Sequence, residues 1–231
     1  MLRVPRVLKS TALGLALSGG TLVCAATPTI DCLYAADTAN NNPTGCASDP
    51  EDVVDIPAVA AAIAAVGVKP SDIQFVGCHD AAFLTVPNLG HSGSRYRIVY
   101  PVDGNLPKTT LVAPLTHEIG HVLQLSLYGS REQLLQRYHG SIDRIELGAD
   151  FIAGIIFRNF QHNDNIREFQ NDLRLAGSYD LASANSHGTP EARIAAFRTG
   201  FFYDLRGQSL ATAHDDFQGE LYSIAAAAEH P

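Results

Sequence analysis

Two histidines stand four residues apart in this chain, and a glutamate directly follows the first. The stretch is His117-Glu118-Ile119-Gly120-His121. On a helix, side chains at positions i and i+4 lie on one face, about 5–6 Å apart between Cβ atoms. Both imidazoles can then reach one Zn²⁺ at roughly 2.0–2.1 Å, with Glu118 close enough to act on a water at the metal. The spacing predicts a hydrolytic zinc site, and the alternative is two hydrogen-bonded histidines on an amphipathic helix.

A catalytic zinc site also needs a third protein ligand and an open coordination position. Gln124 and Leu127 stand where the metzincin pattern has a glycine and a third histidine, so that ligand arrangement is excluded. The gluzincin pattern instead takes a glutamate from a later helix and has an aspartate one turn further on. Glu146 and Asp150 have this spacing. It predicts Glu146 as the third ligand and Asp150 as the acceptor that orients a ligand histidine.

The two acids lie in a segment, residues 141–160, that is otherwise mostly apolar. Burying their charge would be costly unless a metal or a partner compensates for it, which favours the ligand interpretation. Two alternatives remain. Asp150 could be the ligand with Glu146 behind it, or both acids could face solvent and pair with Arg144 or Arg158.

Three blocks of the sequence resemble the neutral zinc metallopeptidases of bacteria. They are residues 115–124, 146–154 and 186–193, and they occur in the order of that family. The ligand pattern is also similar to that of the heat-shock and prenyl-protein zinc endopeptidases. The resemblance covers less than half of the chain, about residues 109–203. It implies a zincin-like α+β fold, rich in helices with a small β-sheet.

The resemblance also assigns roles to residues of the three blocks. It implies His117, His121 and Glu146 as ligands of one Zn²⁺ per chain, Glu118 as general base and acid, and Asp150 as the orienting residue. His187 would stabilise the developing oxyanion or bind the open zinc position. Arg193 would anchor its block or bind a substrate carboxylate. For His187 the alternative is a turn that only leads into the next helix.

Residues 1–26 have the pattern of a secretory signal peptide. Arg3, Arg6 and Lys9 form a basic start, an apolar stretch follows, and small residues around Cys24 offer a cleavage site. The apolar stretch is shorter than the about 20 residues of a membrane-spanning helix. An uncleaved anchor is the alternative. Cleavage predicts a secreted or periplasmic protein without stable membrane insertion.

Charge and length limit the classes of partner and the number of domains. The three basic residues are the only charges in the predicted signal, so its removal takes the formal net charge from −8 to −11. Such an acidic chain is not expected to bind nucleic acid. Residues 27–231 are long enough for one well-buried domain, with 27–50 as a turn-rich N-terminal segment. Cys32 and Cys46 flank its turn residues, which predicts a disulfide between them and leaves Cys78 as a buried thiol.

Two regions of secondary structure are expected around the site, one that contains the strands and one that is helical. A helix is predicted from Pro57 to Gly67, followed by strands at 73–76, 82–86 and 94–100. The last strand, which precedes the motif helix, is expected to offer an exposed edge to an extended substrate.

From Thr109 onward the pattern is helical. Pro114 is expected in the first turn of the motif helix, because a proline further inside removes a backbone hydrogen bond. Ser130 and Thr189 are predicted N-caps of later helices, with a long helix over 141–160 between them. A further helix is expected over 220–229.

Together these patterns predict an exported zinc-dependent endopeptidase that acts on a peptide or protein substrate. Two alternatives belong to other classes. One is a zinc-binding exported module that binds a partner and lacks peptidase activity, and the other is an exported helical domain without a metal.

Overall fold

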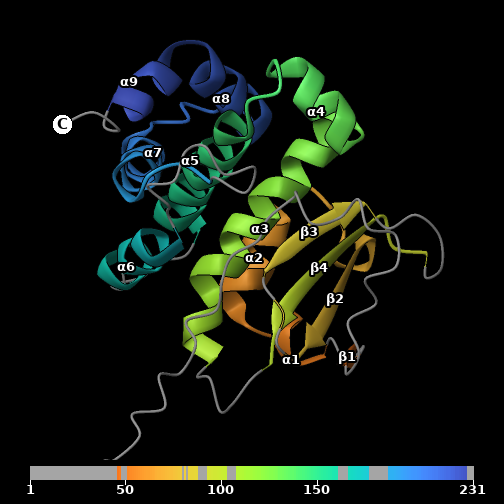
Figure 1. The fold of residues 1–231 in the computed structure, drawn as a ribbon. Coiled ribbons are helices and arrows are strands. Elements are labelled where there is room, and N and C mark those ends of the chain that lie inside the picture. The colour runs from red at the N-terminus through yellow and green to blue at the C-terminus, as the bar shows by residue number, and fades with distance from the viewer. Residues whose placement is uncertain are drawn as a thin grey trace, which may run out of the picture.

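A computed structural model describes residues 46–47, 51–79, 81, 83–87, 93–102, 108–160, 166–176 and 187–227. The described chain is rich in helices and has one small sheet, so its class is α+β (Figure 1). The strands are β1 (Cys46–Ala47), β2 (Ile73–Cys78), β3 (Leu84–Pro87) and β4 (Tyr96–Pro101). The helices are α1 (Glu51–Val54), α2 (Pro57–Ala65), α3 (Lys108–Tyr128), α4 (Arg131–Arg137), α5 (Ile142–Phe160), α6 (Ile166–Ala176), α7 (Pro190–Phe202), α8 (Leu210–Asp216) and α9 (Tyr222–Ala226). The predicted signal peptide and most of segment 27–50 lie outside the described residues.

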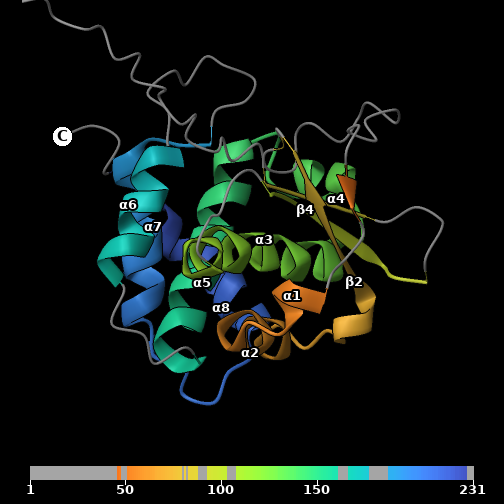
Figure 2. The ribbon, with the colours of Figure 1, turned by 90° about the horizontal axis from the view of Figure 1, so that it is seen from below.

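Helix α3 lies between the sheet and the other long helices. In Figure 1 the strands stand on one side of α3, and α5 to α9 gather on the other. Figure 2, seen from below, places α2 beside α3, and the packing of α2 against both α3 and α5 closes the core. Leu115, Ile119 and Val122 of α3 are fully buried. The helix that carries the histidine motif is therefore enclosed on several faces.

The sheet has the strand order β1-β2-β4-β3. Strands β2 and β4 are parallel, and β3 runs antiparallel to β4, with Thr85 opposite Ile98. The expectation that residues 94–100 form an exposed edge is wrong, because β4 is hydrogen-bonded on both sides. Strand β3 occupies the end of the sheet, and it lies against α3.

Most of the predicted elements are confirmed. The three strands and the helix after Pro57 form close to their expected residues. Ser130 caps α4 by accepting a hydrogen bond from the backbone N–H of Gln133, and Thr189 caps α7 by accepting one from Ala192. These elements were predictable because each begins with a local signal that tertiary contacts do not oppose.

The predicted start of the motif helix is wrong. Helix α3 begins at Lys108, and Pro114 lies inside it. The proline removes one backbone hydrogen bond, but the turns on either side of it are held by buried apolar residues, Leu111 and Leu115 among them. Thr116 adds a hydrogen bond from its hydroxyl to the carbonyl of Val112, at 2.7 Å. Burial of the helix outweighs the local penalty of the proline.

The predicted cysteine pairing is also wrong. Cys46 forms a disulfide with Cys78, and Cys32 lies outside the described residues. Cys46 and Cys78 face each other across the antiparallel pair of β1 and β2. Pairing through the sheet therefore brings together two cysteines that are far apart in sequence, in place of the local loop that their spacing suggested. Cys78 is buried, but it is not a free thiol.

Helices α5 and α7 cross at two glycines. A Cβ on Gly154 of α5 would strike the backbone of Phe197 and Phe201, and one on Gly200 of α7 would strike the backbone of Phe151. The two backbones therefore approach each other more closely than any side chain would allow. Among the described residues, no helix has both the length and the apolar character needed to cross a lipid bilayer.

Candidate metal centre

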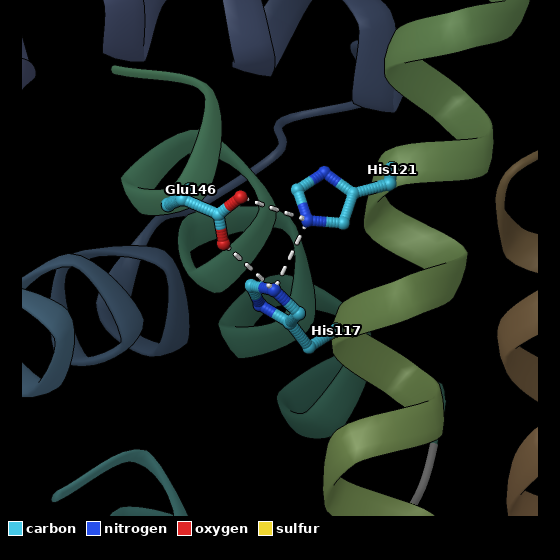
Figure 3. A group of neighbouring side chains, drawn as sticks. All are labelled: His117, His121 and Glu146. Atoms are coloured by element: carbon cyan, nitrogen blue, oxygen red, sulfur yellow. Dashed lines mark hydrogen bonds and ion pairs between the residues drawn. The ribbon is translucent and has the colours of Figure 1, made fainter. Parts of the chain in front are cut away.

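Three side chains from two helices converge inside the protein. His117 and His121 come from α3, and Glu146 comes from α5 (Figure 3). One ligand atom of each lies within 4.8 Å of the others, and all three residues are buried. This group could hold a metal ion. It is the group of His and Glu that the spacing of the sequence selected.

Close packing of α3 against α5 brings the carboxylate to the imidazoles. A Cβ on Gly120 would lie only 2.9 Å from the carbonyl oxygen of Ala149 and 3.1 Å from its Cα. Gly120 and the small Ala149 thus form the contact between the two helices. Glu146 lies about one turn before Ala149, so the same contact directs its carboxylate toward the motif.

The outer nitrogen of each histidine has an oxygen acceptor. His117 Nδ1 lies 2.7 Å from Asp150 Oδ1, and His121 Nδ1 lies 2.8 Å from Gln124 Oε1. Each Nδ1 therefore donates a hydrogen bond to its oxygen partner. In the neutral rings each Nε2 then carries a lone pair. The two Nε2 atoms face each other at 3.1 Å. Two lone pairs directed at one point form the nitrogen part of a cation site.

The carboxylate completes an arrangement that requires a positive charge. Glu146 Oε2 lies 3.3 Å from His117 Nε2, and Oε1 lies 3.6 Å from His121 Nε2. Burial would raise the pKa of Glu146, but the attraction of His121 and His187 holds it well below its usual range. An ionised carboxylate beside two lone pairs repels them unless a proton or a metal ion lies between. The donor set therefore fits a divalent metal ion.

In the metal-free protein, a proton on His117 supplies this positive charge. Burial alone would lower the pKa of His117. The attraction and hydrogen bond of Asp150, with a further hydrogen bond to Glu146, outweigh burial and raise that pKa to about 9. A metal ion held by this group would compete with the proton for the same ring.

Asp150 is held in turn by Arg193. The guanidinium donates two hydrogen bonds, from Nε to Oδ2 at 2.8 Å and from Nη2 to Oδ1 at 2.9 Å. Both residues are fully buried, and Arg193 is the main attraction that lowers the pKa of Asp150 against the effect of burial. Paired in this way inside the protein, Arg193 has the geometry of an anchor. The alternative in which Asp150 and Glu146 face solvent beside Arg144 or Arg158 is wrong.

Glu118 is oriented from the sheet. The hydroxyl of Thr85, in the end strand β3, donates a hydrogen bond to Glu118 Oε2 at 2.6 Å. Thr85 Oγ1 also lies 3.1 Å from the backbone carbonyl oxygen of Glu118. Both residues are fully buried. Strand β3 thus orients the Glu118 carboxylate, whereas Glu146 comes from α5, on the other side of α3.

His187 lies at the edge of this group. Its Nδ1 is 3.3 Å from Glu146 Oε2, and its exposed fraction is 5%, the largest among the histidines of the site. It is not one of the three residues whose ligand atoms converge. Because it precedes the cap Thr189 by two residues, the start of α7 determines its position.

Three residues at the site were not selected from the sequence: Thr85, Gln124 and His214. Gln124 was considered only for its place in the metzincin pattern, although its i+3 spacing from His121 puts the two on one helix face. Thr85 has no local signal, since its role depends on β3 lying against α3. His214 comes from α8 and reaches the motif helix through Gln124.

Comparisons with protein-family models, with curated proteins and with solved structures found no match to this chain. The chemistry of the site accordingly rests on its own side chains. Two imidazoles and a carboxylate could hold a metal ion, and Glu118 follows the first of those imidazoles directly in the chain.

Proposed function

We propose that this chain is an exported zinc metallopeptidase with a zincin-like fold. The observation that carries the proposal is the convergence of His117, His121 and Glu146 within 4.8 Å on a helix that also carries Glu118. Two imidazoles and one carboxylate are a ligand set of catalytic zinc sites, which keep the fourth position open for water or substrate. Zn²⁺ is therefore the metal we assign to these residues.

The three ligands would hold one Zn²⁺ per chain. When bound, the ion would acidify a water molecule at the site and polarise the carbonyl of the peptide bond to be cleaved. Asp150 and Gln124 keep the Nδ1 protons of the two histidines in place, so that both Nε2 lone pairs stay directed at the site. Arg193 offsets the charge of Asp150 and keeps that carboxylate ionised.

Glu118 is the proton carrier in this proposal. It takes a proton from the attacking water and delivers it to the amine that leaves when the peptide bond breaks. The hydrogen bond from Thr85 restricts the rotamers of the Glu118 carboxylate, so the same geometry serves both proton transfers. His187, beside Glu146 and slightly exposed, is the side chain we assign to the developing oxyanion.

The sheet supports a peptide as substrate. Strand β3 stands at the end of the strand order and carries Thr85, which contacts Glu118. The end strand of a sheet can pair with an extended peptide through backbone hydrogen bonds. Such a peptide would run alongside the residue that carries the proton. The disulfide between Cys46 and Cys78 supports export, because disulfides persist in oxidising compartments.

A zinc-binding module without peptidase activity is the second candidate. The burial of Glu118 favours it, since none of this side chain is exposed. A closed site could hold zinc and leave no room for a substrate. In that case the module would bind a partner through another surface, and the metal would serve stability alone.

Zinc content and hydrolysis of an unstructured protein such as casein separate these functions. We expect about one zinc per chain, retained in Glu118→Gln and lost in His121→Ala. Hydrolysis should fall by a factor on the order of 10²–10⁴ in Glu118→Gln, because the proton carrier is lost. Glu220→Gln, the same change at an exposed position, is the matched control and should leave both properties unchanged. Zinc without hydrolysis in the unaltered protein would identify the binding module, and absence of zinc would refute both candidates.

A further inference from the structure

A chain of buried polar side chains runs from His121 away from the metal centre. Gln124 Oε1 accepts from His121 Nδ1 at 2.8 Å, and Gln124 Nε2 donates to the backbone carbonyl of Ile145 at 2.8 Å. The amide also lies 3.2 Å from His214 Nε2. Gln124 and His214 are fully buried. Four elements of structure meet here, since Gln218 of the π-helical segment Phe217–Leu221 also contacts His214.

The carbonyl of Ile145 determines which way the amide of Gln124 points. A backbone carbonyl can only accept, so the NH₂ group of Gln124 must face it and the amide oxygen must face His121. An amide oxygen can only accept, so His121 must carry its proton on Nδ1. The lone pair of His121 is then on Nε2, the atom directed at His117 and Glu146. One backbone carbonyl thus fixes the tautomer of a ligand ring on another helix.

His214 accepts a hydrogen bond from the second N–H of the Gln124 amide. Its Nε2 faces two amide nitrogens, those of Gln124 at 3.2 Å and of Gln218 at 3.5 Å. Both are donors, because the amide of Gln218 is itself oriented by a hydrogen bond from Nε2 to the carbonyl of Arg144, at 2.8 Å. The facing nitrogen of His214 must therefore be unprotonated. Burial lowers the pKa of His214 to about 4, which keeps the ring neutral.

The cluster is packed so that it has one arrangement. A Cβ on Gly148 of α5 would lie 2.6 Å from Gln218 Nε2, 2.8 Å from Gln124 Nε2 and 2.9 Å from His214 Nε2. Because Gly148 has no side chain, these three groups can occupy the space beside it. His214 Nδ1 has no hydrogen-bond partner among the described residues, a cost of about 1–3 kcal/mol that an apolar residue would avoid. The acceptor nitrogen of His214 explains why a histidine stands there.

We propose that Gln124, held by Ile145 and His214, is the positioning residue of His121. It fixes the orientation and tautomer of this ring, as Asp150 does for His117. The inference rests on the proposed zinc site and adds to it a second support, built from α8 and the carbonyl of a neighbouring helix. The two histidines then differ in their supports. His117 is held by the charged pair of Asp150 and Arg193, whereas His121 is held by the uncharged side chains of Gln124 and His214.

Gln124→Met tests the proposal, because methionine has a similar volume and no amide. We expect zinc affinity, measured by competition with a chelator, to fall about 10- to 100-fold, the usual effect of losing a residue that orients a ligand. The visible absorption spectrum of the Co²⁺-substituted protein should change as well, because the ring moves relative to the metal. Gln218→Met is the matched control. It alters the same cluster and does not contact His121, so its zinc affinity and Co²⁺ spectrum should stay those of the unaltered protein.

Gln124→Glu provides a partial rescue. It keeps an oxygen that accepts from His121 Nδ1 but loses both amide hydrogens that bind Ile145 and His214, so its zinc affinity should lie between that of Gln124→Met and that of the unaltered protein. If Gln124→Met does not fold, His214→Leu replaces it. Several-fold weaker zinc binding is expected there, because the amide keeps one anchor of two.

The outcomes separate this inference from the proposed function. Unchanged zinc affinity in Gln124→Met, or in His214→Leu where that variant is used, would overturn the positioning role while the zinc site stands. Equal losses in Gln124→Met and Gln218→Met would also overturn it, since the effect would then be one of general stability. If the unaltered protein binds no Zn²⁺, the proposed function fails before any variant is compared.

Discussion

At the proposed zinc site, a metal ion would compete with a proton for the ring of His117. His117 and His121 direct their Nε2 atoms at each other, and Glu146 adds a negative charge beside them. Each outer nitrogen is fixed by an acceptor, so neither ring can turn its lone pair away. In the metal-free protein His117 holds the proton that relieves the repulsion. A bound metal ion must therefore displace that proton.

We predict that zinc binding releases a proton from His117. Because the pKa of His117 is raised to about 9, the ring is protonated at pH 7 in the metal-free protein. Zinc binding at pH 7 should release close to one proton from His117, and the apparent affinity should rise about tenfold per pH unit from pH 7 toward pH 9. Calorimetry in buffers of different ionisation enthalpy measures the proton directly.

Asp150→Asn provides the comparison for that measurement. The substitution removes the attraction that raises the pKa of His117 and keeps the size of the side chain. Less proton release at pH 7 is expected from this variant. An affinity that does not depend on pH in the unaltered protein would show that His117 is not the protonated group.

Two close contacts between helix backbones position the residues of the site. Gly120 allows α3 to approach Ala149 of α5, and the glycine pair of α5 and α7 lets those helices cross. The second contact has a consequence for the site, because α7 carries Arg193, which holds Asp150. A change in the distance between α5 and α7 would therefore alter the support of His117. Through α7, the packing of the helices would therefore affect the affinity of the proposed site for zinc.

Gly154→Ala tests this link between elements. The added methyl group would strike the backbone of Phe197 and lie 2.7 Å from the backbone nitrogen of Phe201, neither of which can rotate away. We expect a loss of about 1–3 kcal/mol in the free energy of unfolding, measured with urea, because overpacking forces the helices apart. Zinc affinity should fall in the same variant.

Gly219→Ala is the matched control for that substitution. It is also a helical Gly→Ala change, but apart from neighbouring residues of its own helix, no atom of the described residues lies within 4 Å of the added Cβ. Higher helix propensity should leave this variant as stable as the original or stabilise it by up to about 1 kcal/mol. Equal behaviour of the two variants would contradict the close crossing of α5 and α7.

The whole molecule joins a sheet and a group of helices on opposite sides of α3, and the site draws on both. Thr85 reaches Glu118 from the sheet, whereas Glu146, Asp150 and Arg193 come from the helical side. Helix α8 contributes the buried His214, which contacts Gln124. Stability of the entire fold therefore depends on a titratable group in its interior.

We predict that acid destabilises the folded protein through His214. The folded pKa of His214, about 4, lies below its ordinary value of 6.5. Between these values the unfolded chain binds the proton and the folded protein does not, so stability is complete above about pH 6.5 and falls as pH drops toward 4. The loss from this group should reach about 3 kcal/mol. The stabilising effect of His117, whose pKa is raised, is complete below pH 6.5 and adds no slope in this window.

Urea unfolding of the metal-free protein between pH 4.5 and 7 measures this effect. His214→Leu should remove most of the slope, which is up to about 1.4 kcal/mol per pH unit for one proton. His139→Asn, at an exposed histidine with a positive φ of 55°, is the control and should keep the slope. A slope that persists in His214→Leu would assign the acid sensitivity to another group.

Features that depend on local spacing could be predicted from the sequence. The i, i+4 geometry of a helix placed His117 and His121 on one face, and the four-residue spacing of Glu146 and Asp150 did the same for the second helix. The caps Ser130 and Thr189 fixed where their helices begin, since each hydrogen-bonds within its own first turn. Such features involve residues of one element, so their physical cause is contained in a short stretch of chain.

Features that join distant segments could not be predicted in this way, because they depend on how the chain packs. Cys46 pairs with Cys78 because two strands bring them together, and Pro114 stays helical because burial on both sides of it outweighs one lost hydrogen bond. The supports of the site are Thr85 for Glu118 and His214 for Gln124, and no local signal in the sequence marks either contact. A contact of this kind depends on how helices and strands pack, and packing is a property of the whole chain.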